Sequence, residues 1–168
     1  QHGYGIKAKG MGGVGIALPQ DSLAAATNPA GMAFIGNRLD AGLDWFRPIR
    51  DSEIEGNAFF GGVTQKYDAN DRKNFFIPEF GYNRMIRPDL ALGVLIYGNG
   101  GMNTDYAGGQ LPANSCGAGA PASNVLCGQG RLGVDLMQLI IAPTLAYKVS
   151  DNHSFGISPL LVKQIFKA

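Results

Sequence analysis

Apolar and polar residues alternate along this chain in runs that are unusually long for strands. The clearest run covers roughly residues 132–147, where Met137, Leu139, Ile141, Leu145 and Tyr147 share one parity. Successive side chains of a strand point to opposite faces, so the run predicts a strand with one apolar face. Strands of soluble proteins centre on about 5–6 residues, whereas membrane-crossing strands need about 9–11. The length of this run therefore favours a transmembrane sheet.

Four shorter runs repeat the pattern, at residues 39–45, 76–83, 90–97 and 155–161. Short turns join some of these runs, and long polar stretches join the others. Long strands connected alternately by short turns and long loops are typical of an outer-membrane barrel. The sequence therefore predicts an all-β fold in which residues 38–168 supply about five antiparallel strands of a transmembrane barrel. The apolar parity, which includes Leu43, Phe80, Val94 and Ile141, is expected to face lipid.

Three prolines fall on the apolar parity of these runs, at Pro78, Pro143 and Pro159. Proline has no backbone N–H and cannot donate to a strand ladder, so these positions are awkward in any sheet. A soluble antiparallel sandwich would also alternate, and strand length is what favours the barrel over it. A membrane-spanning helix needs roughly 20 apolar residues, and the longest apolar stretch, Leu136–Tyr147, is much shorter.

Residues 1–37 are rich in glycine and alanine and show little alternation. Asp21 or Ser22 is expected to cap a short helix through Leu23–Ala26, which Pro29 prevents from continuing. Small-residue material of this kind suits a compact plug better than a barrel wall. The run Gly10–Gly15 matches the dinucleotide-binding pattern G-x-G-x-x-G, but no buried strand precedes it and no strand–helix units follow. Close backbone packing explains the run better.

The two cysteines, Cys116 and Cys127, lie in a stretch of Gly, Ala, Ser, Pro and Asn. A cysteine pair inside a polar loop predicts a disulfide and an oxidising compartment, with two unrelated thiols as the alternative. The first residues, Gln1–Tyr4, have the character of a mature terminus left after removal of a signal segment.

Several function classes find no support in the sequence. The net charge of +1, with 14 scattered basic residues, gives no footprint for nucleic acid. His2 and His153 have no G-x-S-x-G serine to activate. Asp40, Asp44 and Glu79 are more typical of charges lining a barrel lumen than of an acid–base pair. We therefore expect no enzyme, no cofactor, no metal site and no energy-coupling element.

The N-terminal motifs resemble the hatch segment of the FadL family of outer-membrane channels. These motifs are the run Gly10-Met11-Gly12-Gly13-Val14-Gly15-Ile16-Ala17, then Asp21, then Asn28-Pro29-Ala30-Gly31-Met32. Their order, followed by the first strand, is more specific than Asn-Pro-Ala alone. Residues 93–101, 104–109, 146–147 and 153–156 are similar to the family as well, so the resemblance covers essentially the whole chain.

The resemblance implies the N-terminal portion of a fourteen-stranded barrel in the outer membrane of a Gram-negative cell. Residues 1–37 would form a hatch inside the lumen, with Asn28, Pro29 and Ala30 as its motif. The implied function is passive transport of long-chain fatty acids or of other hydrocarbon or aromatic molecules. Outer-membrane lipid and lipopolysaccharide would surround the barrel. The residues that contact substrate are not identified.

In that family a kink in the third strand opens the barrel wall. The resemblance places this lateral opening at Gly98, Asn99, Gly100 and Gly101, where glycine permits a bulge and asparagine tolerates unusual dihedral angles. A plain strand end entering a long loop is the alternative. Two other functions compete with lateral transport, a porin for polar solutes and a structural or adhesive barrel. The small-residue plug argues against an open porin.

Overall fold

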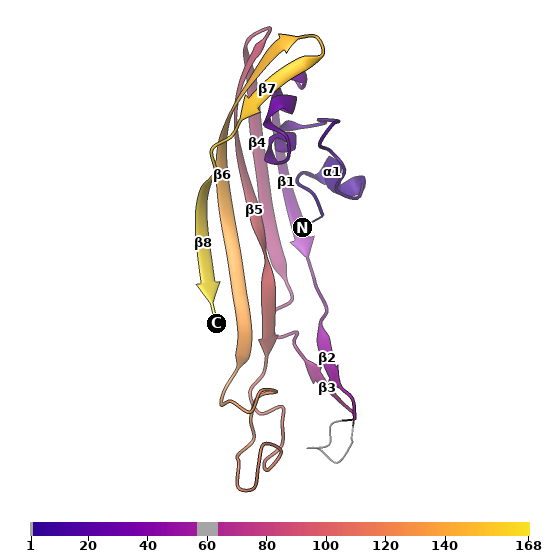
Figure 1. Ribbon diagram of the computed structural model, residues 1–168, viewed down its shortest axis with the longest axis vertical. Helices are drawn as coiled ribbons and strands as arrows, with labels where there is room; N and C mark the ends of the chain where they lie inside the picture. The colour runs from indigo at the N-terminus through magenta and orange to yellow at the C-terminus, as the bar shows by residue number, and fades with distance from the viewer. Residues whose placement is uncertain (1, 57–63) are drawn as a thin grey trace. The chain divides into compact units, whose positions relative to one another are not determined.

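The computed structural model describes residues 2–56 and 64–168. Its main sheet has the strand order β1-β4-β5-β6-β7, and β8 also pairs with β6 (Figure 1). These strands are β1 (Arg38–Phe46), β4 (Phe75–Arg87), β5 (Leu90–Tyr106), β6 (Leu132–Ser150), β7 (His153–Ile157) and β8 (Leu161–Lys167). A separate hairpin pairs β2 (Asp51–Ile54) with β3 (Gln65–Asp68). The predicted antiparallel all-β fold is confirmed.

Three details differ from the sequence prediction. The polar stretch 50–74 contains the β2–β3 hairpin, whose two strands pair through their backbones in an antiparallel register from Asp51↔Asp68 to Ile54↔Gln65. Strand β5 continues through the glycines after Tyr97 and ends only at Tyr106. The last run is divided into β7 and β8, with residues 158–160 outside both strands.

The two faces of the sheet differ as the alternation predicts. On β6, Ile141 is 37% exposed while its neighbour Ala142 is fully buried. On β1, Leu43 is 63% exposed, and the polar parity is partly covered. The apolar parity is therefore the outward face. Within the described part of the chain, no helix is long and apolar enough to cross a membrane.

The N-terminal segment, residues 2–37, packs on the opposite face of the sheet. It contains α1 (Ile6–Gly10) and two 3-10 helices, η1 (Ser22–Ala26) and η2 (Pro29–Phe34), drawn in indigo and violet beside β1 and β4 in Figure 1. Leu23 and Met32 of these helices join a buried cluster with strand residues that include Ala91, Leu95 and Ala142. The core is thus shared between the N-terminal segment and the sheet.

The chain divides into two compact units, and the division falls within the long strands. The first unit comprises Gln1–Trp45, Phe76–Gly101 and Met137–Gln164. The second comprises Phe46–Phe75, Met102–Leu136 and Ile165–Ala168. The first unit holds the N-terminal segment and its sheet contacts, and the second holds the β2–β3 hairpin and the loop between β5 and β6.

Candidate functional site

Asp40 on β1 fixes the start of η1. The backbone N–H and the hydroxyl of Ser22 both donate to Asp40 Oδ2, at 2.9 and 2.7 Å. Arg38 donates to both oxygens of the same carboxylate. Asp21, rather than Ser22, caps the helix by accepting the N–H of Leu23 at 3.0 Å. Burial, together with the nearby charge of Asp40, raises the pKa of the Asp21 carboxyl.

A buried ion pair links α1 to β4 and β1, two strands of the main sheet, which is called the wall below. Lys9 Nζ lies 2.5 Å from Glu79 Oε1 on β4 and 3.1 Å from Asp44 Oδ2 on β1. The Glu79 side chain is only 1% exposed, and its second oxygen has no hydrogen-bond partner. A charge this enclosed needs an opposite charge close by. Lys9 supplies that charge, so the burial of Glu79 depends on α1 being docked.

The Asn-Pro-Ala motif lies at the junction of η1 and η2. The Asn28 side-chain amide donates to the Ile16 carbonyl at 2.8 Å, and its oxygen accepts the N–H of Ala30 at 3.2 Å. Asn28 therefore caps η2, and Pro29 begins that helix at a position where its missing N–H costs nothing. The helix η1 has already ended at Ala26.

Glycines on the wall allow the N-terminal segment to approach closely. They are Gly42, Gly81, Gly93 and Gly156, one each on β1, β4, β5 and β7. A Cβ at Gly93 would lie 2.6 Å from Met32 Cε, and one at Gly156 would collide with the backbone of Pro29 and Ala30. Side chains at these positions would displace the segment, so glycine on this face of four strands is what permits the close approach.

Asn83 gives β4 a second polar hold on the N-terminal segment. It is fully buried, and its side-chain amide donates to the carbonyls of Met32 and Gly36, at 2.9 and 2.8 Å. These bonds satisfy one carbonyl inside η2 and one just after it. A buried asparagine with two such partners fixes the position of the chain as it turns into β1.

The residues predicted to form the lateral opening lie inside β5. The N–H of Gly100 is accepted by the side-chain oxygen of its neighbour Asn99 at 3.0 Å. The Asn99 amide contacts Gln138 of β6 at 3.4 Å, and Gln138 in turn donates to Gln164 of β8 at 2.7 Å. A row of amide side chains thus crosses three strands beside the glycines.

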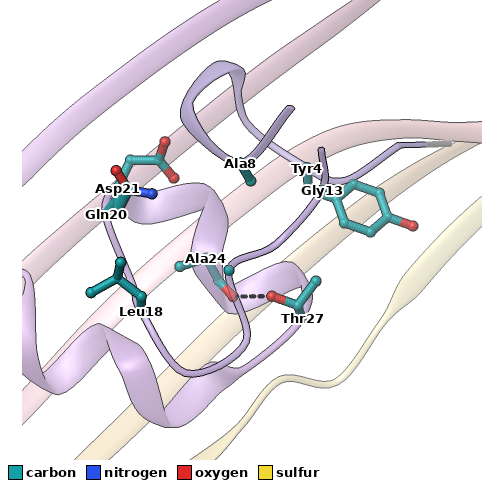
Figure 2. Close-up of a pocket in the computed structure, with 9 residues that line it drawn as sticks. Tyr4, Ala8, Gly13, Leu18, Gln20, Asp21, Ala24 and Thr27 are labelled. Carbon is teal, nitrogen blue, oxygen red and sulfur yellow. Dashed lines mark hydrogen bonds between the residues drawn. The ribbon is translucent and has the colours of Figure 1, made fainter. Parts of the chain in front are cut away.

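The chain also contains a disulfide and a small hollow. The structure joins Cys116 to Cys127, with Cα atoms 5.7 Å apart, in the loop between β5 and β6. A small hollow within the N-terminal segment is lined by Tyr4, Leu18 and Thr27 among others, and Thr27 donates to the Ala24 carbonyl beside it (Figure 2). Across residues 2–56 and 64–168, no group of three or more His, Cys, Asp or Glu residues could hold a metal ion.

Sequence reasoning identified some of these residues and missed the role of others. Asp21 makes the capping contact that its position suggested, whereas Asn28 was singled out only as part of its motif and its capping of η2 was not foreseen. The partnership of Lys9 with Glu79 and the anchoring role of Asn83 were not foreseen. The one available signal was that Glu79, Gly81 and Asn83 share the non-apolar parity of their strand.

The comparisons with known proteins agree with this arrangement. The chain resembles the crystal structure of the P. putida toluene transporter TodX, with a TM-score of 0.67 and 22% sequence identity. The match covers 98% of this chain and 36% of that chain, so this chain spans about a third of that structure's length. At this identity the likeness establishes the fold alone. Among curated protein sequences, none matches the chain.

The match to a family model extends over nearly all of the chain. The model is described as an outer membrane protein transport protein (OMPP1/FadL/TodX), and it matches residues 3–167. The predicted resemblance and the predicted location in the Gram-negative outer membrane are thereby confirmed. The chain belongs to the OMPP1/FadL/TodX family of outer-membrane transport proteins.

Proposed function

We propose that the full-length protein lets hydrophobic molecules cross the outer membrane passively and releases them sideways through the wall at Gly98–Gly101. The N-terminal segment serves as a hatch that fills the lumen of the complete barrel. The observation that carries the proposal is the docking of this segment onto the inward face of the sheet, through Lys9–Glu79 and the wall glycines. A porin for polar solutes needs an open lumen at this level.

The β4–β5 ladder supports an exit at this place. The antiparallel register runs from Arg87↔Leu90 to Glu79↔Tyr97, and its continuation places Pro78 opposite Gly98. Proline offers no donor to either neighbour, and glycine weakens a strand. The N–H of Gly100 donates to the side-chain oxygen of its neighbour Asn99. Backbone groups in a membrane must be satisfied internally, so local side-chain bonds of this kind lower the cost of parting the strands.

The proposed substrates are molecules with large apolar surfaces, such as long-chain fatty acids, hydrocarbons and single-ring aromatics. The similar structure is titled a toluene transporter, which makes toluene a suitable first probe. Release into the bilayer needs no energy source, because an apolar molecule is more stable there than in water. We propose no catalytic role and no cofactor.

The test closes the wall at β5. Replacing Gly100 and Gly101 with valine favours continuous strand pairing, because β-branched residues suit a pleated ladder. In cells that carry the full-length protein, Gly100→Val/Gly101→Val should reduce uptake of labelled oleate and toluene without changing surface expression. Ala41→Val adds a β-branched residue to an exposed position of β1 and provides the matched control.

Two results would contradict the proposal. Unchanged uptake in a variant whose Gly98–Gly101 amides are shown by hydrogen exchange to be protected would favour a straight channel through the barrel. Passage of small sugars through the unmodified protein, at rates similar to those of a general porin, would favour transport of polar solutes. It would also mean that the N-terminal segment does not block the lumen.

A further inference from the structure

The strand that follows β6 is interrupted at residues 158–160, which lie between β7 and β8. Strand β7 pairs with β6 in one register from Lys148↔Ser154 to Leu145↔Ile157, after a shift between Lys148 and Ser150, and β8 pairs with β6 beyond the gap. Continuing the same register would place Gln138 opposite Gln164, and these two side chains are indeed hydrogen-bonded at 2.7 Å. This bond supports treating β7 and β8 as one strand that leaves the ladder for three residues and returns in the register of Leu145↔Ile157.

Two prolines meet at the interruption. Extended by two pairs beyond Leu145↔Ile157, the register places Thr144 opposite Ser158 and Pro143 opposite Pro159. Neither proline has an N–H, so each strand lacks one backbone donor at the same level of the wall. The Thr144 and Ser158 hydroxyls lie 2.6 Å apart, and the Thr144 hydroxyl also reaches the Ala142 carbonyl at 3.2 Å. Side chains thus replace part of the ladder.

The N-terminal segment rests beside this interruption. Pro29 and Ala30 lie directly over Gly156, two residues before Ser158, at a distance that leaves no room for a Cβ. The helix η2 packs along β7. Any shift of η2 away from the wall therefore removes support from the strand segment that borders the gap.

From this arrangement we infer that the wall has a second lateral opening between Pro143 and Pro159, which the docked N-terminal segment keeps closed. The inference rests on the proposed function, since it supplies another sideways route for the same transport. Four side chains border the opening on the inward parity, namely Ala142, Thr144, Ser158 and Leu160. None of these side chains carries a charge, and the two hydroxyls already bond one another. The opening therefore offers no positive group for a carboxylate and suits an uncharged apolar molecule.

A reversible cross-link tests the opening directly. In the full-length protein, Thr144→Cys/Ser158→Cys should form a disulfide on oxidation, because the two hydroxyl oxygens are already in contact. Oxidised cells should lose part of their toluene uptake, and reductant should restore it. The unmodified protein, carried through the same oxidation and reduction, controls for Cys116–Cys127. Normal toluene uptake in a variant shown by mass spectrometry to be cross-linked would overturn the inference.

A second pair of substitutions guards against misfolding of the cysteine variant. Pro143→Val/Pro159→Val restores both donors and should slow hydrogen exchange at residues 142–145 and 157–160. It should reduce uptake of toluene more than uptake of oleate. Unchanged toluene uptake with slowed exchange would also overturn the inference.

Comparison with Gly100→Val/Gly101→Val separates this inference from the proposed function. Loss of uptake in the glycine variant alone overturns the second opening and leaves the exit at β5. Loss in the proline variant alone supports the second opening and overturns the exit at β5. Partial losses in each, with a deeper loss in the combined variant, support both. Full uptake in all three overturns both.

Discussion

The N-terminal segment and the loop 107–131 are both irregular, glycine-rich stretches, but they are held in different ways. The N-terminal segment depends on the wall: Asp40, Glu79 and Asn83 lie on strands and bond or pair with it. The loop depends mainly on itself. Leu111 and Ser123 exchange both backbone hydrogen bonds, at 2.9 and 3.0 Å, within the loop.

The loop also carries its own covalent and side-chain links. Cys116 is bonded to Cys127, and the Asn124 side-chain oxygen accepts the N–H groups of Leu126 and Gly128. A self-contained loop can vary without affecting other parts, whereas a docked segment responds to every change in its docking surface. This difference fits the proposed role of the N-terminal segment as a hatch, which has to move relative to the strands. It also predicts that substitutions in one region leave the other unchanged.

The largest effect is expected from Lys9→Met. Removing one member of a buried pair leaves the Glu79 charge uncompensated, at a cost of about 3–5 kcal/mol. The N-terminal segment should detach, and hydrogen exchange at Ser22 and Leu23 should accelerate, while Leu111 exchanges as before. The double variant Lys9→Met/Glu79→Gln removes the buried charge and should recover most of the protection. Equal exchange in Lys9→Met and the unmodified protein would show that the pair does not hold the segment.

A somewhat smaller effect is expected from Gly156→Val. Its side chain would overlap the backbone of Pro29 and Ala30, and overpacking of this kind costs up to about 3 kcal/mol. Trypsin should then cleave the N-terminal segment at Lys7 and Lys9 more rapidly. Gly101→Val serves as the control for strand folding, because a Cβ at Gly101 meets nothing within 4 Å. Equal cleavage in both variants would mean that the close approach at Gly156 is not needed for docking.

The strands could be predicted from the sequence because the alternation of apolar and polar residues is a local property. The alternation at 39–45 gave β1 within a residue of its bounds, Arg38–Phe46, and the long run from Leu132 gave the start of β6. The division of the last strand could not be predicted. It falls where the register of Leu145↔Ile157, extended by two pairs, brings Pro159 opposite Pro143, and register is set by pairing between distant segments.

The candidate site shows the same limit. Capping by Asp21 involves a residue two positions away and was predicted from the sequence, and the cap made by Asn28 spans the same short distance. The pair Lys9–Glu79 joins residues 70 positions apart, and Asn83 reaches Met32 across 51 positions. No local pattern identifies such partners. Only the shared inward parity of Glu79 and Asn83 pointed to them.

In the loop, Cys116→Ser/Cys127→Ser should cost about 2–3 kcal/mol of local stability, because the bond closes a short loop in the unfolded chain. Hydrogen exchange at Leu111 and Ser123 should accelerate, and exchange at Ser22 and Leu23 should stay the same. The single variant Ser115→Ala, next to the bond but outside it, provides the control. Detachment of the N-terminal segment in the double serine variant would contradict the independence of the two regions.

The smallest effect is expected from Arg131→Ala, at the end of the loop. Arg131 pairs with Asp71 at 2.7 Å and with Asp105 at 2.9 Å, but its side chain is 58% exposed. Exposed ion pairs contribute little, since water and salt screen them. The hydrogen bond that Arg131 donates to Asp105 raises the pKa of the arginine, which is charged at physiological pH in any case, so no pH dependence should follow. The unfolding temperature and the loop amide exchange should therefore match those of the unmodified protein.

A clear loss of protection at Leu111 would mean that the ion pairs, and not the loop's own bonds, hold the loop in place. Removal of the charge at Lys9 should instead detach the N-terminal segment. Comparison of the loss of amide protection in the two variants therefore measures how much more a buried ion pair contributes than an exposed one.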